Sequence, residues 1–143
     1  MKVAVAQLRP GADKGQNLAA TVRVIESAAE QGVELLVLPE LCTSPYQLRD
    51  ADLGYWAENS SEGPAITTWS ELCREHNITL VAGILEQADR KFYNSAIQIG
   101  PSGLQSCYRK IHLFGWEQTR LTAGDQPPTL VQTGAGKIGS LIC

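Results

Sequence analysis

The hydrophobic positions fall into short continuous runs separated by longer stretches with helical spacing. Residues 3–8 and 35–38 are apolar runs of strand length, and a Pro-Gly pair ends the first run. Between the two runs, apolar residues recur every three or four positions, at Leu18, Val22, Ile25 and Ala29. This pattern predicts a strand, a helix and a parallel strand, with Asn17 as the helix cap and Gly32 as its stop.

The middle of the chain contains an aperiodic segment, a second helical pattern and three further apolar runs. Residues 41–60 have no clean period, which predicts a long loop. Pro64 suits the first turn of a helix that ends at Asn77, with its inner stripe at Ile66, Trp69, Leu72, Cys73 and His76. The apolar runs predict strands at 79–86, 92–99 and 104–110. A tight turn joins the last two, so we expect them to pair antiparallel and the sheet to be mixed.

Residues 137–143 form another apolar run, and it ends on Cys143. A run of this kind predicts a buried parallel strand with Cys143 at its carboxyl end. In open α/β sheets, ligands bind outside the carboxyl ends of the strands. Buried cysteine is also a common core residue, so position alone leaves both a nucleophile and an inert thiol open.

Charge and composition narrow the class of protein. The chain has 143 residues and a formal net charge of -3, and its lysines and arginines are scattered singly. This distribution excludes the basic surface of a nucleic-acid-binding protein. No apolar stretch approaches the roughly 20 residues that span a bilayer, and the N-terminus has no signal-peptide core. We therefore expect one cytoplasmic, mildly acidic domain that has neither nucleic acid nor membrane as a partner.

The four cysteines are far apart in the sequence, at Cys42, Cys73, Cys107 and Cys143. They form no C-x-x-C pair, so the pattern predicts neither a metal site nor a disulfide framework. Four free thiols fit a reducing compartment best.

Three reactive side chains lie at the ends of predicted strands. Glu40 follows the second strand, Lys110 ends the fifth and Cys143 ends the last. A thiol that attacks a carbonyl or nitrile carbon needs a base, and a glutamate in an apolar loop can act as that base. A lysine ammonium in a dry pocket stabilises the oxyanion that forms. Glu40 or Lys110 alone is better explained as a surface residue, but with Cys143 they predict acyl transfer.

Two predicted loops near these positions carry aromatic side chains. Tyr46 lies in the segment 41–60 and Trp116 in the segment 111–117. Aromatic residues in such loops can wall a small-molecule pocket, so Tyr46 and Trp116 are candidate substrate-binding residues. A loop pinned by its own aromatic residues is an equally open explanation.

Several short motifs run through the whole chain in a fixed order. They are Val3-Ala4-Val5-Ala6-Gln7, Leu38-Pro39-Glu40, the strand containing Gly83, Tyr93-Asn94-Ser95-Ala96, Tyr108-Arg109-Lys110-Ile111-His112-Leu113-Phe114-Gly115 and Gly139-Ser140-Leu141-Ile142-Cys143. With these motifs the chain resembles the N-terminal half of a nitrilase-superfamily carbon-nitrogen hydrolase. The resemblance implies that Glu40 is the general base, Lys110 stabilises the intermediate and Cys143 is the nucleophile that forms an acyl-enzyme.

The resemblance also implies a second glutamate that helps to position the substrate and the catalytic groups. Glu117 is the best match, and it lies just before residues 122–125, where relatives usually carry Pro-Gly-Asp. Ala123 replaces that proline, a change that concerns the loop and no catalytic group. The position of His112 is structural in the family, so we do not expect this histidine to be the base.

The family fold is an α/β fold, an α-β-β-α sandwich with mixed sheets, and its protomers commonly pair into dimers or larger homo-oligomers. By this resemblance, residues 1–143 are the N-terminal part of a single domain that ends here at the nucleophile. Relatives are roughly twice as long, so we expect the chain to be one piece of a longer protein. No metal or organic cofactor is implied, because thiolate, carboxylate and ammonium suffice for acyl transfer to water.

The expected reaction is hydrolysis of a small linear amide to a carboxylic acid and ammonia, because residues 114–117 resemble the amidase branches of the family. Hydrolysis of an N-carbamoyl compound and hydrolysis of a nitrile are the alternatives within the enzyme class. A catalytically inactive fragment that serves in binding or assembly is the alternative from another class.

Overall fold

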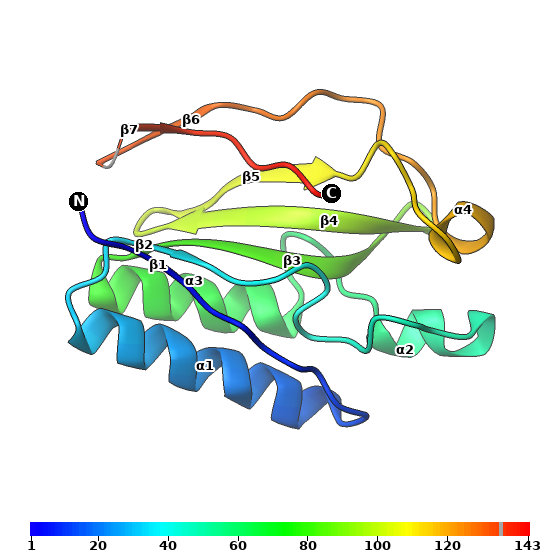
Figure 1. Cartoon of the computed structure of the whole chain (residues 1–143), viewed down its shortest axis with the longest axis horizontal. Helices are drawn as coiled ribbons and strands as arrows, with labels where there is room; N and C mark the ends of the chain where they lie inside the picture. Colours follow the sequence, from blue (N-terminus) through cyan, green and yellow to red (C-terminus); the bar gives the residue numbers. More distant parts are fainter. Residues whose placement is uncertain (135) are drawn as a thin grey trace.

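The computed structural model describes residues 1–134 and 136–143, and Figure 1 shows its layers. The elements, in chain order, are β1 (Val3–Val5), α1 (Lys14–Glu30), β2 (Leu35–Val37), the 3-10 turn η1 (Asp50–Asp52), α2 (Leu53–Trp56), α3 (Pro64–His76), β3 (Thr79–Ala88), β4 (Lys91–Gly100), β5 (Gly103–Arg109), α4 (Glu117–Arg120), β6 (Val131–Thr133) and β7 (Gly136–Ile138). Every helix and strand predicted before residue 110 is present, with ends that differ by a few residues.

A five-stranded mixed sheet in the order β1-β2-β3-β4-β5 forms the centre of the fold. β1 pairs with β2 and β2 with β3 in parallel, whereas β3–β4 and β4–β5 are antiparallel. The predicted parallel unit and the predicted antiparallel pair are both confirmed. The switch follows from the connections, since helices join the parallel strands and tight turns join the antiparallel ones.

Helices α1 and α3 cover one face of this sheet (Figure 1). Buried apolar residues of the helices pack with those of the strands, and they include Ile25, Ile66, Trp69, Cys73, Leu80, Ile84, Ile97 and Ile99. The indole of Trp69 donates a 2.8 Å hydrogen bond to Thr21 Oγ1 and so joins the two helices within the core. Among the described residues, no helix is both long and apolar enough to cross a membrane.

The start of α1 differs from the prediction by one turn. Asp13 is the N-cap, and its carboxylate accepts a 2.8 Å hydrogen bond from the backbone N–H of Gln16. Asn17, predicted as the cap, lies inside the helix. Its buried amide instead bonds the backbone N–H and carbonyl of Gly11 and the carbonyl of Thr43. Asp and Asn are both good N-cap residues. Asn17 contacts Thr43 of the distant loop, and Asp13 is left to cap the helix.

The segment 41–60 is more structured than its aperiodic sequence indicates. It contains η1 and α2, which are too short to produce a helical period. Leu53 and Trp56 of α2 pack with Leu41 and Leu85 in a second apolar cluster. The buried Trp56 thus anchors the segment 41–60 to the second apolar cluster, whereas Tyr46 of the same segment is exposed.

The terminal segment contradicts the prediction of a buried parallel strand that ends at Cys143. β7 covers only Gly136–Ile138, and it pairs antiparallel with β6 in a separate two-stranded sheet. Residues 139–143 lie outside any strand, and Leu141 is 71% exposed. The segment lies on the face of the large sheet opposite α1 and α3 (Figure 1), where Ile142 packs on Ala96 and Tyr108. An apolar run can join a sheet as a strand only beside a free strand edge. Residues 139–143 lie over a face of the sheet, so they form no strand there.

Candidate active site

The two faces of the β4–β5 pair carry different side chains because neighbouring strand residues point in opposite directions. Ser95 is paired with Arg109, and the next residue pair, Asn94 and Lys110, is joined by the bond from Lys110 N to Asn94 O. Arg109 therefore points to the helix-covered face and Lys110 to the opposite face, where the terminal segment lies. The candidate site is on this second face.

The Lys110 ammonium lies between two carboxylates. Lys110 is 1% exposed, and its Nζ is 2.8 Å from Glu40 Oε1 and 2.9 Å from Glu117 Oε2. Burial opposes the charged form of the amine, but the hydrogen bonds to Glu40 and Glu117 outweigh it, so the pKa of Lys110 lies above its ordinary value. The lysine is therefore a fixed positive charge at neutral pH.

Glu40 reaches this lysine because the segment after β2 runs along the edge of β3 and packs closely against a glycine. Gly83 N–H donates to the Pro39 carbonyl at 3.2 Å, and Cys42 N–H donates to the Gly83 carbonyl at 2.8 Å. A Cβ atom on Gly83 would lie 2.6 Å from Glu40 Cα, so only glycine permits this close approach. Leu41 adopts a φ of 50°, which turns the chain directly after Glu40.

Glu117 is the first residue of α4 and is fully buried. Its Oε2 accepts hydrogen bonds from Lys110 and from the backbone N–H of Phe114, the latter at 2.8 Å. Its Oε1 accepts a 2.6 Å bond from Asn94. Three donors thus hold the carboxylate rigidly, which suits the positioning role implied by the resemblance.

Asn94 contacts both carboxylates, although the sequence marks it only as part of the motif at residues 93–96. Its Nδ2 donates to Glu40 Oε1 at 2.5 Å and to Glu117 Oε1 at 2.6 Å. A signal was present in the sequence, because Asn94 interrupts a strand whose other residues are largely buried. A polar side chain at such a position needs buried hydrogen-bond partners.

Cys143 lines a cavity together with Glu40, and it makes no direct hydrogen bond to the other site residues within the described part of the chain. A cavity of about 150 Å³ is lined by Glu40 and Cys143 together with Gly83, Ala96, Leu141 and other apolar residues. The side chain of Cys143 is exposed, and within the described residues its thiol makes no hydrogen bond to Glu40 or Lys110. The expected base and the expected nucleophile therefore face the same small space.

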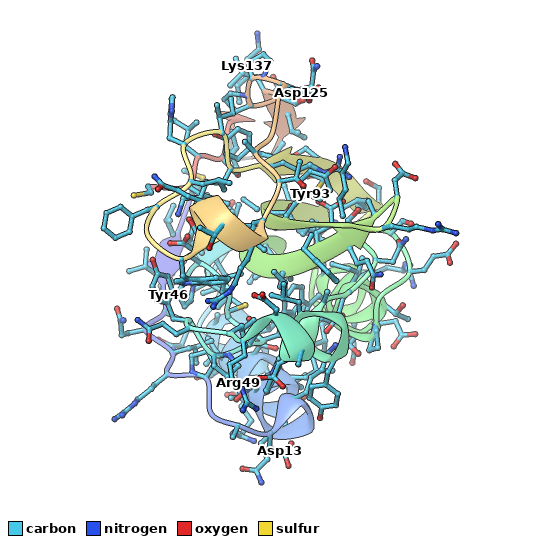
Figure 2. The ribbon with its side chains drawn as sticks, turned by 90° about the vertical axis from the view of Figure 1, so that its right-hand side faces the viewer. Asp13, Tyr46, Arg49, Tyr93, Asp125 and Lys137 are labelled. Carbon is cyan, nitrogen blue, oxygen red and sulfur yellow. The ribbon has the colours of Figure 1, made fainter. Side chains whose placement is uncertain are left out.

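The two predicted substrate-binding residues lie next to each other at the edge of this group. The rings of Tyr46 and Trp116 meet edge to face, with centroids 6.5 Å apart and planes at 89°. Figure 2 shows Tyr46 on the side of the molecule that carries α4. Partial burial raises the pKa of the half-exposed Tyr46, and the nearby charges of Glu40 and Glu117 raise it further.

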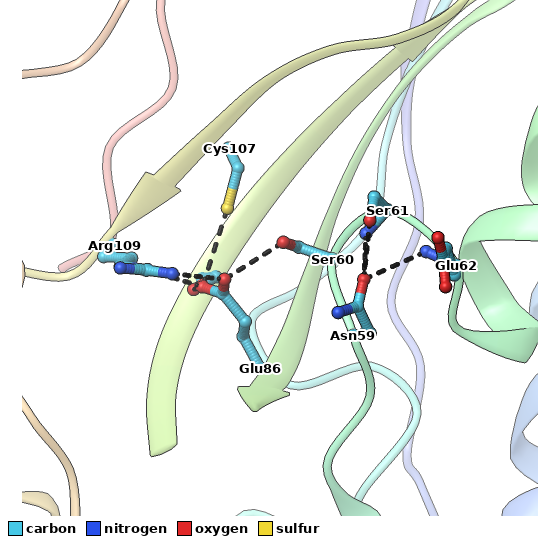
Figure 3. A network of polar contacts seen from close by, with 8 residues as sticks. Asn59, Ser60, Ser61, Glu62, Glu86, Cys107 and Arg109 are labelled. Atoms are coloured by element: carbon cyan, nitrogen blue, oxygen red, sulfur yellow. Dashed lines mark hydrogen bonds and ion pairs between the residues drawn. The ribbon is translucent and has the colours of Figure 1, made fainter. Parts of the chain in front are cut away.

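A second polar network occupies the helix-covered face of the same strands (Figure 3). Its centre is the buried Glu86, which accepts two hydrogen bonds from Arg109, at 2.9 and 2.7 Å. Ser60, Ser95 and the Cys107 thiol also donate to this carboxylate. The Arg109 guanidinium in addition lies 3.9 Å from the centre of the Tyr93 ring. Every oxygen lone pair of Glu86 is thus engaged.

No group of three or more histidine, cysteine, aspartate and glutamate side chains suited to a metal ion occurs among the described residues. The polar groups of the candidate site are a buried ammonium, two carboxylates, an amide and an exposed thiol. Such a set can transfer protons and stabilise negative charge around a thiol nucleophile.

Comparison with known proteins decides the family. The model of the carbon-nitrogen hydrolase family matches residues 2–143. The chain belongs to this family. The protein named nitrilase from Pyrococcus abyssi is 33% identical over 145 residues, which cover 100% of this chain and 55% of that protein. The chloroplastic omega-amidase of Arabidopsis thaliana is 35% identical over 155 residues, which cover 99% of this chain and 42% of the enzyme.

The fold of the carbon-nitrogen hydrolase chain agrees with solved structures. Saccharomyces cerevisiae Nit3, described as a member of branch 10 of the nitrilase superfamily, superposes with a TM-score of 0.80 at 30% identity. That match covers 97% of this chain and 54% of Nit3. The α/β fold with a mixed sheet is therefore the nitrilase type, as predicted. The chain spans about half the length of the relatives it matches.

Proposed function

We propose that the complete protein hydrolyses a non-peptide carbon-nitrogen bond, most simply that of a small linear amide, through a Cys143 acyl-enzyme. One observation carries the proposal: Lys110 bridges Glu40 and Glu117 at 2.8 and 2.9 Å, while Glu40 and Cys143 line the same cavity. The names of the relatives, nitrilase and omega-amidase, support the reaction class.

The two oxygens of Glu40 differ in a way that suits a general base. Oε1 accepts the hydrogen bonds from Lys110 and Asn94, whereas Oε2 accepts none within the described part of the chain. The Glu40 side chain is also 28% exposed, unlike that of Glu117. Oε2 is therefore the atom available to take a proton from the thiol.

In the first half-reaction, Cys143 Sγ attacks the amide carbonyl carbon while its proton passes to Glu40. The carbonyl oxygen becomes an oxyanion, and the Lys110 ammonium stabilises its charge. When the carbon-nitrogen bond breaks, Glu40 returns the proton to the leaving nitrogen, and ammonia departs. A thioester on Cys143 remains.

In the second half-reaction, water attacks the thioester carbon and gives its proton to Glu40. The new tetrahedral intermediate is stabilised in the same way and expels the Cys143 thiolate. The thiolate regains the proton from Glu40, and the carboxylic acid is released. The small cavity, about 150 Å³, favours a compact acyl group.

The test uses the complete protein and measures ammonia release from a panel of amides, N-carbamoyl amino acids and nitriles. We expect amides to give the highest kcat/KM, and Cys143→Ala to lower turnover by at least about 10⁴-fold while the protein stays folded. Turnover that persists in Cys143→Ala excludes the covalent mechanism. Preference for a nitrile, the substrate class named for the Pyrococcus abyssi relative, would move the proposal to that branch.

Thiol labelling separates an enzyme from an inactive assembly module. Burial, together with the charge of Glu86, raises the pKa of Cys107 to about 11. Iodoacetamide at pH 7.5 should therefore modify Cys143 well before Cys107, since only the thiolate reacts. Peptide mass spectrometry measures both rates in one sample. Cys143 that labels no faster than Cys107 would favour the inactive module.

We further propose that the protein works as a homo-oligomer, a dimer or larger, in the cytoplasm. The resemblance to the family supports the oligomer. The four cysteines are free in the described part of the chain, and this fits a reducing compartment. Size-exclusion chromatography with light scattering measures the oligomeric state.

A further inference from the structure

Asn94 is the neutral member of the candidate site, and it is 1% exposed. Its amide can act neither as a general base nor as a nucleophile at neutral pH. It nevertheless donates to both carboxylates over the short distances of 2.5 and 2.6 Å. Hydrogen bonds to ionised acceptors are the strong ones, so these two contacts fix the relative orientation of Glu40 and Glu117.

The orientation of the Asn94 amide follows from its neighbours. An amide oxygen in the place of Nδ2 would face two carboxylate oxygens, and all three groups would repel one another. The nitrogen must therefore face the carboxylates. Oδ1 then has no hydrogen-bond partner among the described residues, although it is buried. An unpaired buried acceptor destabilises a fold, so stability alone does not explain this arrangement.

The charges of the site need a neutral donor at this position. Two carboxylates and one ammonium leave one negative charge uncompensated when all three groups are ionised. Lys110 can bond one oxygen of each carboxylate but cannot fix their rotation. The two N–H groups of Asn94 supply a second contact to Glu40 and a third contact to Glu117 without adding charge. A cation at this position would compete with Lys110, and an anion would repel both glutamates.

Both contacts to Glu40 fall on the same oxygen. Lys110 Nζ and Asn94 Nδ2 each bond Oε1, which turns Oε2 away from the two donors. Without Asn94, the carboxylate could rotate and place either oxygen on the lysine. Glu40 lines the cavity shared with Cys143, and its proton acceptor would then no longer be one fixed oxygen.

We propose that Asn94 is a positioning residue: its two amide hydrogens lock Glu40 and Glu117 around Lys110 and leave Glu40 Oε2 free to act as the base. This inference rests on the proposed hydrolase function. It assigns Asn94 to the rate of the chemical step rather than to substrate affinity.

The experiment compares Asn94→Leu and Asn94→Ser with Ser95→Ala in the complete protein. Ser95 is the matched control, because it is the next residue of β4, is equally buried and donates to a carboxylate on the opposite face. We expect both Asn94 variants to lower kcat by about 10²-fold with KM changed less than about 3-fold, and Ser95→Ala to keep kcat within about 3-fold.

The pH profile supplies a measurement that a purely structural role would not move. Loss of the Asn94 donors removes hydrogen bonds to the charged carboxylates, so the acid limb of kcat/KM should move to higher pH in Asn94→Leu. The acid limb should stay in place in Ser95→Ala. Circular dichroism and thermal unfolding establish that each variant is folded.

Three results would overturn the inference. The first is a folded Asn94→Leu with wild-type kcat and an unchanged acid limb. The second is a rise in KM alone, which would make Asn94 a binding residue. The third is unfolding of both Asn94 variants while Ser95→Ala stays folded, which would assign Asn94 to stability. Activity in Cys143→Ala would instead refute the proposed function, so the two failures are distinguishable.

Discussion

The two faces of the β4–β5 pair each hold a carboxylate beside a cation, yet the two carboxylates differ in their hydrogen bonding. On the helix-covered face, Glu86 accepts hydrogen bonds from Arg109, Ser60, Ser95 and Cys107. On the other face, Glu40 accepts two bonds on one oxygen and none on the other within the described residues. The first carboxylate is saturated, and the second keeps an acceptor free.

The hydrogen bonding of the carboxylate distinguishes the reactive face from the structural face better than the volume of the adjacent cavity does. The cavity beside Glu86 and Arg109 measures about 490 Å³, whereas the one beside Glu40 and Cys143 measures about 150 Å³. The Glu86 carboxylate already has all its hydrogen-bond partners, so it has no acceptor left for a reacting molecule. We infer that the smaller cavity is the reactive one, because it joins a free carboxylate oxygen to an exposed thiol.

The largest effect on activity is expected from a pair of substitutions at neighbouring residues whose side chains point to opposite faces of the sheet. Lys110→Met should lower ammonia release by at least about 10³-fold, because the oxyanion loses its stabilising charge. Arg109→Met should leave kcat within about 3-fold and lower the free energy of unfolding by about 2 kcal/mol, since its guanidinium is one-third exposed and its loss leaves Glu86 underpaired.

Steady-state kinetics and urea unfolding measure both variants in the complete protein. The comparison between the faces would fail if folded Arg109→Met lost activity as severely as Lys110→Met. It would be sharpened if the two variants separated cleanly, one in rate and the other in stability.

An intermediate effect is expected from Gly83→Ala. The added methyl group would lie 2.6 Å from Glu40 Cα and 2.7 Å from Leu41 N, so the loop that carries the base must move. We expect kcat to fall by about 10–10²-fold and stability to fall by about 1–3 kcal/mol.

Gly54→Ala is the control for this change, because a Cβ atom on Gly54 meets nothing within 4 Å and its helix favours alanine. Gly54→Ala should keep full activity, and its free energy of unfolding should rise by up to about 1 kcal/mol. Equal activity in Gly83→Ala and Gly54→Ala would show that the close packing at Gly83 does not position Glu40.

The smallest effect concerns stability against acid. Burial of Glu86 opposes its charge, but the hydrogen bonds from Arg109 and Ser95 outweigh it, so the pKa of Glu86 lies below its ordinary value. A carboxyl group of this kind stabilises the fold above its unfolded pKa, about 4.3, and loses this contribution as the pH falls through its folded pKa. The free energy of unfolding of Glu86→Gln should therefore fall less steeply than that of the wild type below about pH 4.

Urea unfolding of wild type and Glu86→Gln between pH 3 and 7 tests this sign. At pH 7 the variant should be about 2 kcal/mol less stable, with the difference shrinking toward pH 3. A difference that grows as the pH falls would contradict the assignment of Glu86 as an ionised structural group.

Much of the fold followed from local pattern. The stripe of apolar residues after Pro64 predicted α3 to its last turn, and the apolar runs predicted β3, β4 and β5. Glu40 and Lys110 were also proposed from their positions at strand ends and Glu117 from the family resemblance, and in the structure Lys110 contacts both glutamates. The path of residues 139–143 was predicted wrongly, because a run of apolar residues does not state whether it meets an edge or a face of a sheet.

The sequence by itself determined helices α1 and α3, strands β1 to β5 and the side chains able to do chemistry, because backbone preference and side-chain periodicity act over a few neighbouring residues. Only the tertiary structure decided which of these side chains meet. Glu40 is 54 positions from Asn94 and 70 from Lys110, and their contacts depend on the close approach of the chain to Gly83 and on the pairing of β4 with β5. Hydrogen bonds between such distant residues are set by the path of the whole chain, and this path turned an unremarked asparagine into the link between two carboxylates.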